Sequence, residues 1–130
     1  MREVCFILAG EKILRVSFGT QTRIPDEPER WDVIWEHRFE ITEIAHSHPG
    51  EFLDFSNEDL TTIEAVEAGT GKRFVWSIVT KTGFLSREEG KGSRREDAPW
   101  WLEFLRRLSY DEPVPRKTIK KTTIRKEKKQ

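Results

Sequence analysis

The chain has 130 residues, of which 35% are hydrophobic and 35% are charged, and it contains a single cysteine, Cys5. This length suits one domain, and one cysteine excludes both a disulfide scaffold and a zinc finger built from several cysteines. No apolar run approaches the roughly 20 residues that cross a bilayer, and the first residues lack the apolar stretch of a secretory signal, so we expect a cytoplasmic protein without membrane contact.

Charge is distributed unevenly although the formal net charge is zero. Residues 113–130 contain eight lysines and arginines and one glutamate, so the rest of the chain is acidic. We expect residues 1–110 to form the domain and residues 111–130 to form a basic, disordered tail. A basic tail can contact nucleic acid, but this one has no aromatic residues that could stack on bases, so we do not expect nucleic acid as a partner.

The first half of the chain predicts mostly β-structure. The apolar run 3–9 and the alternating run 12–18 predict a β-hairpin, and residues 19–30 predict a loop. From Trp31 to Ile41 every second residue is apolar or histidine, which predicts one or two strands exposed on one side, with a helix over 28–38 as the alternative.

The second half predicts alternating strands and helices. Residues 44–48 predict a short strand before Pro49, and a helix follows from Ser56 to the glycines at 69 and 71. Residues 73–80 are apolar on both faces and predict a central strand. Residues 86–97 are charged and predict a mobile loop, and a last helix begins near Pro99 with one apolar face.

The segment with the clearest chemistry is His46-Ser47-His48-Pro49, followed by Ser56 and Asp59. Two histidines two residues apart on a strand lie on one face, with Cα atoms roughly 6–7 Å apart. Asp59 falls in the first turn of the next helix, so two imidazoles and a carboxylate can converge. Three nitrogen and oxygen ligands without a thiolate suit Zn²⁺ and leave a coordination position for water.

Each part of this pattern also has a structural interpretation. Ser56 and Asp59 match a capping box at a helix start, and two histidines on a strand can be a half-buried polar pair. The combined spacing H-x-H-P-x₆-S-x₂-D is rare by chance, however, and therefore favours a metal site.

The combined pattern resembles the JAMM motif of the MPN/JAB-domain zinc metalloproteases. That family also has a glutamate on an earlier strand, and the run Glu3-Val4-Cys5-Phe6-Ile7-Leu8-Ala9-Gly10 is similar to that strand, with Phe6 where glycine is common. The resemblance covers roughly residues 1–85. It implies an α/β fold related to cytidine deaminases, in which helices flank a mixed, curved β-sheet.

The resemblance also implies a reaction. One Zn²⁺ per chain would be held by His46, His48 and Asp59, and the substrate would be a peptide or isopeptide bond at the C-terminal tail of a ubiquitin-like protein or its conjugate. Glu3 would take the proton from the attacking water and deliver it to the leaving amine. Ser56 would donate a hydrogen bond to the oxyanion of the tetrahedral intermediate.

Two other functions stay open. The domain could be a catalytically silent MPN-type scaffold, although it retains all five motif positions. It could also be a nucleic-acid-associated protein similar to the RadC branch, which shares the H-x-H-P core, although the acidic body disfavours this. Outside the motif, we expect Cys5 to be an inert buried thiol, His37 to be packed or paired with an acid, and Trp100-Trp101 to cover the sheet.

Overall fold

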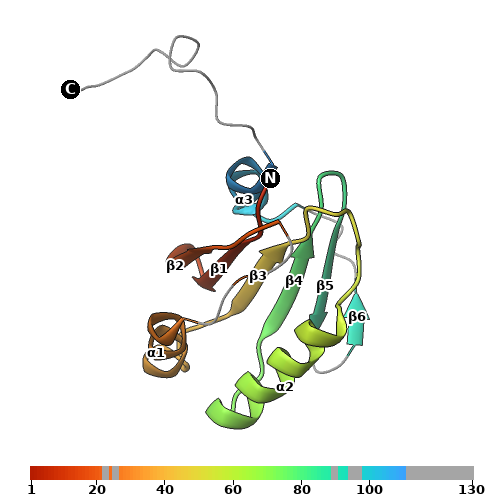
Figure 1. The fold of residues 1–130 in the computed structure, drawn as a ribbon. Helices are drawn as coiled ribbons and strands as arrows, with labels where there is room; N and C mark the ends of the chain where they lie inside the picture. Colours follow the sequence, from red (N-terminus) through yellow and green to blue (C-terminus); the bar gives the residue numbers. More distant parts are fainter. Residues whose placement is uncertain (22–23, 25–26, 89–90, 94–97, 111–130) are drawn as a thin grey trace, which may run out of the picture.

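The computed structural model describes residues 1–21, 24, 27–88, 91–93 and 98–110, and the expected tail at 111–130 lies outside them. Within the described residues the chain forms an α/β fold, with six strands in one mixed sheet and three helices (Figure 1). The strand order is β2-β1-β3-β4-β5-β6. None of the helices in these ranges has the length and apolar character that a bilayer span requires.

The predicted hairpin is confirmed. Strands β1 (Val4–Ala9) and β2 (Lys12–Phe18) pair antiparallel, and Gly10 makes the turn between them with a φ of 61°, a conformation that glycine adopts without strain. On its other side β1 pairs antiparallel with β3 (Glu43–Ser47), in a register that sets Cys5 opposite His46. The hairpin therefore brings the start of the chain next to the strand that carries the histidines.

Strands β3 and β4 (Val75–Val79) are parallel, and helix α2 (Asn57–Thr70) connects them. Ser56 caps the start of α2, and Gly71, with a φ of 70°, caps its end. Strand β4 lies between β3 and β5, so its predicted central position is confirmed. Because the crossover leaves β3 at its carboxyl end, the start of α2 lies beside the end of the histidine strand.

Two predictions of local structure were wrong. The strand expected from Trp31 is wrong and the alternative of a helix over 28–38 is confirmed, since residues 28–36 form helix α1 (Pro28–Glu36), with proline in its first turn and Ile34 as its buried residue. The expected loop at 86–97 contains the end of β5 (Phe84–Glu88) and the short strand β6 (Lys91–Ser93), which pair antiparallel. Residues 89–90 and 94–97 of that expected loop lie outside the described part of the chain.

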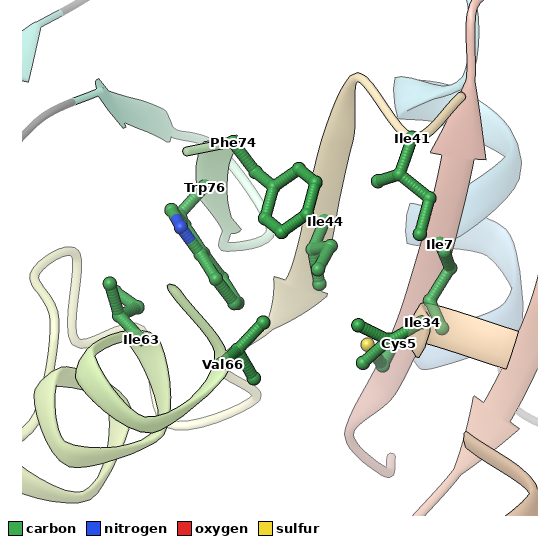
Figure 2. Packing of buried hydrophobic residues seen from close by; sticks show 9 residues of the cluster. All are labelled: Cys5, Ile7, Ile34, Ile41, Ile44, Ile63, Val66, Phe74 and Trp76. Atoms are coloured by element: carbon green, nitrogen blue, oxygen red, sulfur yellow. The ribbon is translucent and has the colours of Figure 1, made fainter. Parts of the chain in front are cut away.

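The sheet separates two hydrophobic clusters. On one face, α1 and α2 pack over alternate residues of β1, β3 and β4, including Cys5, Ile44 and Trp76 (Figure 2). On the opposite face, α3 (Leu102–Tyr110) packs over a second cluster: Val4, Phe6, Leu8, Ala45, Val79, Trp101, Leu102 and Leu105. Burial of Trp101 was predicted and is confirmed, whereas Trp100 is 53% exposed, so the expectation holds for one of the two tryptophans.

Candidate metal centre

The candidate metal centre lies where β3 ends and α2 begins. His46 is the fourth residue of β3, and His48 follows the strand directly, with its backbone N–H donating to the Val79 carbonyl at 2.8 Å. This bond continues the parallel pairing with β4 up to Pro49. The two histidines consequently keep strand spacing and lie on one face, the face that α2 covers.

Three side chains converge at this point, and they are the three predicted ligands: His46, His48 and Asp59. Nε2 of His46 lies 3.0 Å from Nε2 of His48 and 3.0 Å from Oδ1 of Asp59, and Nε2 of His48 lies 3.1 Å from Oδ2 of Asp59. The side chains are 13%, 11% and 17% exposed, respectively. Among the described residues, this group of histidine, cysteine and acidic side chains is the one whose geometry could hold a metal ion.

The spacing of the donor atoms fits zinc. A tetrahedral Zn²⁺ with bonds of about 2.0–2.1 Å requires ligand atoms roughly 3.3 Å apart, close to the 3.0–3.1 Å between the donor atoms of these three side chains. All of these donor atoms are nitrogen or oxygen, the ligand set of catalytic zinc sites. The His-His-Asp group could therefore hold one zinc ion with little movement of the side chains.

Asp59 is oriented by the start of α2. Its Oδ2 accepts a hydrogen bond from the backbone N–H of Ser56 at 2.8 Å, and its own backbone N–H donates to Ser56 Oγ at 3.1 Å. The capping box predicted as the structural alternative is thus present, together with the triad. Burial alone would raise the pKa of Asp59, but hydrogen bonds from His46, His48 and the Ser56 amide hold the pKa of this carboxyl well below its usual range.

His48 is oriented from the other side by a backbone carbonyl. Its Nδ1 lies 2.7 Å from the Phe52 oxygen, so Nδ1 carries the proton and, in the neutral ring, Nε2 presents its lone pair to the triad. Burial alone would lower the pKa of His48, but the hydrogen bonds to Asp59 and to the Phe52 carbonyl raise this pKa above its ordinary value. Sequence reasoning missed Phe52, because a backbone acceptor carries no residue signature.

Glu3 lies on the wall of the same cavity. Cys5 faces His46 across the β1–β3 pair, and Glu3 precedes Cys5 by two residues, so Glu3 shares the face of the histidines. The cavity has a volume of about 670 Å³ and is lined by Glu3, the three triad residues, Ser56 and apolar side chains of α1 and α2. Burial raises the pKa of Glu3, and the nearby imidazoles of His46 and His48 oppose this rise.

The other sequence expectations have clear outcomes. Cys5 is 8% exposed, and burial raises the pKa of its thiol to about 11, as expected of an inert cysteine. His37 pairs with Glu40 at 3.2 Å, outside the triad, as expected. Glu58 was not singled out from the sequence, although it also lines the cavity.

Comparisons with known proteins add no further assignment. No protein-family model matches the chain, and a search of curated proteins returns no match. The functional argument therefore depends on the residues of the site and on their geometry.

Proposed function

We propose that this chain is a zinc-dependent metallopeptidase or isopeptidase of the JAMM type, with the cytidine-deaminase-like JAB/MPN form of the α/β fold. Its proposed substrate is the peptide or isopeptide bond at the C-terminal tail of a ubiquitin-like protein or its conjugate. The observation that carries the proposal is the convergence of His46, His48 and Asp59 on the wall of a cavity that also contains Glu3 and Ser56.

His46, His48 and Asp59 would hold the metal, which when bound supplies a Lewis acid that polarises the scissile carbonyl and lowers the pKa of water. The Phe52 carbonyl and the Ser56 amide keep two of these ligands oriented, in the way that outer partners orient ligands in zinc enzymes. Three protein ligands leave a position for substrate or water, which a closed structural zinc site lacks.

Glu3 and Ser56 supply the remaining groups. A carboxylate with a raised pKa next to the triad suits a base that takes a proton from the attacking water and returns it to the leaving amine. Ser56 Oγ accepts from the Asp59 amide, and its hydroxyl hydrogen is a separate donor for a developing oxyanion. The positive end of the α2 dipole at Ser56 favours the same negative charge.

The cavity suits an extended peptide segment. Trp31, Ile34 and Phe52 line it together with the polar triad, so apolar contacts can hold a chain while the polar groups act on one bond. The exposed fraction of Trp31, 38%, leaves an aromatic surface at the cavity for the substrate.

The first experiment measures zinc and cleavage in parallel on the full chain. We expect about one zinc ion per chain and cleavage of ubiquitin-like fusions encoded near this gene. The double variant His46→Ala/His48→Ala should stay folded and lose both properties, whereas His37→Ala, which removes the histidine outside the triad, should keep both. Undiminished zinc in the double variant would disprove the metal site. Stoichiometric zinc without cleavage of any peptide or isopeptide substrate would favour the silent scaffold.

A further inference from the structure

Two buried serines meet beside Glu3, on the sheet face opposite the triad. Ser47 of β3 is fully buried and Ser109 of α3 is 1% exposed. Ser109 Oγ lies 2.7 Å from Ser47 Oγ and 2.6 Å from the Arg2 carbonyl oxygen, and Ser47 Oγ lies 2.9 Å from the Val4 backbone nitrogen. Figure 1 shows the same proximity at the level of the fold, with the N-terminus beside α3.

These contacts link the Val4 N–H to the Arg2 carbonyl through the two serine hydroxyls. The Val4 N–H can only donate, the Arg2 carbonyl can only accept, and each serine hydroxyl has a single hydrogen. Val4 therefore donates to Ser47, the two serine hydroxyls are hydrogen-bonded to each other, and the Arg2 carbonyl accepts from a serine hydroxyl, with Ser109 Oγ at 2.6 Å and Ser47 Oγ at 3.5 Å. This series of three hydrogen bonds, the serine relay, leaves the chain at Val4 and returns to it at Arg2, so it spans Glu3.

The backbone of Glu3 itself is held by the two residues that follow β2. Its N–H donates to the Thr20 carbonyl at 2.6 Å, and its carbonyl accepts from the Gly19 N–H at 2.8 Å. Glu3 precedes the first residue of β1, a position where strand ends fray unless their backbone groups are bonded. The serine relay binds the peptide groups on both sides of Glu3. Ser47 itself lies between His46 and His48 in the chain, so the relay links Glu3 to the segment that carries the histidines.

We propose that Ser47 and Ser109 are positioning residues that fix the Glu3 carboxylate relative to His46, His48 and Asp59. The catalytic part of this inference rests on the proposed function. Because the side chain of Ser47 points away from the histidines, its hydroxyl touches no ligand and acts through the backbone of Arg2 and Val4. A base displaced by about 1 Å can lose roughly 100-fold in rate, so a backbone link of this kind affects turnover.

The test compares Ser109→Ala and Ser47→Ala with a matched control, Ser86→Ala. Ser86 is also a buried serine, 3% exposed, and its hydroxyl bonds to Ser77 Oγ at 2.8 Å on strands that do not contact Glu3. In Ser109→Ala we expect kcat to fall at least about tenfold with KM and zinc content unchanged, while Ser86→Ala stays near the wild-type rate. The double variant Ser47→Ala/Ser109→Ala should lose no more than either single variant, since one relay is broken in all three.

Amide hydrogen exchange of Val4 and Glu3, measured by NMR, tests the relay without any reference to activity. In the wild-type protein both amides should exchange slowly, and in Ser109→Ala the Val4 amide should exchange at least about tenfold faster than in Ser86→Ala. Rapid exchange of both amides in the wild-type protein, or equal loss of kcat in Ser109→Ala and Ser86→Ala, would overturn the proposal. If the wild-type protein cleaves no peptide, the proposed function fails, and the exchange comparison alone decides whether the relay holds Glu3.

Discussion

Ser56 and Asp59 exchange two hydrogen bonds across the first turn of α2, at 2.8 and 3.1 Å, and the Asp59 oxygen that takes part also lies 3.1 Å from Nε2 of His48. A capping box and a metal ligand therefore share one carboxylate. The cap restricts the rotamer of Asp59, and this restriction brings its two oxygens toward the two imidazoles. Helix capping and ligand placement are here two effects of the same local sequence.

Substitutions of Ser56 separate its two roles. Ser56→Ala should lower the free energy of unfolding by about 1 kcal/mol, whereas Ser56→Gly should cost only a few tenths of a kcal/mol, since glycine is tolerated at an N-cap. Both variants lack the hydroxyl, and both should lose roughly 10²–10³-fold in kcat. Urea unfolding and cleavage kinetics measure the two effects. If kcat instead decreases only in proportion to the loss of stability, so that Ser56→Gly is nearly as active as the wild type, Ser56 only caps the helix and has no catalytic role.

Glu3→Gln keeps the shape of the side chain and removes the base. We expect zinc content and KM to stay close to those of the wild type and kcat to fall at least about 10²-fold. Glu58→Gln is the matched test, because Glu58 is the other glutamate on the cavity wall. A wild-type rate in Glu3→Gln together with a large loss in Glu58→Gln would assign the base to Glu58 instead.

The structure also narrows the choice of an alternative base. Sequence reasoning would turn next to Glu36, Glu40 and Glu43, which come shortly before His46 in the chain. Glu43 is buried on the other face of the sheet, where it accepts from Ser77 Oγ, and Glu40 pairs with His37. None of these three lines the cavity. Proximity in sequence therefore does not identify the base, because side chains alternate between the two faces of β3 and that of Glu43 lies on the face opposite the triad.

The features that could be predicted from sequence depend on local pattern. The hairpin at residues 4–18, the helix from Ser56 and the convergence of His46, His48 and Asp59 each follow from spacing within one or two adjacent elements. For the segment of helix α1, the local pattern left two structures open, a strand from Trp31 and a helix over 28–38. Trp31 and Trp35, which belong to the apolar residues at every second position, are 38% and 54% exposed. This alternation therefore does not mark the buried face of a strand.

Contacts between distant segments lie beyond such patterns. The Ser109 hydroxyl at the Arg2 carbonyl is set by tertiary packing, with the two residues 107 positions apart in the chain. The same holds for Tyr110, whose hydroxyl donates to the His48 carbonyl at 2.7 Å. A serine or tyrosine at the end of a helix is common, and only the fold shows that these two lie behind the candidate site.

Removal of residues 113–130 tests the prediction that the basic tail has no catalytic part. The truncated chain, ending at Glu112, should bind zinc and cleave a short peptide with the kcat and KM of the full chain, because all motif residues lie before Tyr110. Loss of peptide cleavage by a folded, zinc-loaded truncated domain would show that the tail contributes to the site.

The pH dependence of zinc binding follows from the pKa of His48. Metal ligands bind as neutral imidazoles, so zinc must displace any proton on His48. Hydrogen bonds to Asp59 and the Phe52 carbonyl raise the pKa of His48 despite its burial, so the metal-free protein holds this proton at a higher pH than an ordinary histidine does. Apparent zinc affinity should therefore fall as pH decreases through this raised pKa, by up to about tenfold per pH unit for one proton.

Asp59 should not add to this dependence between pH 5 and 8, because its pKa lies well below the usual range and it stays ionised throughout. Competition with a zinc chelator, corrected for the chelator's own protonation, measures the curve from pH 5.5 to 8.5. His37→Gln provides the control, since His37 pairs with Glu40 outside the triad and its loss should leave the curve unchanged. A zinc affinity that stays constant across this range would mean that His48 carries no proton in the free site.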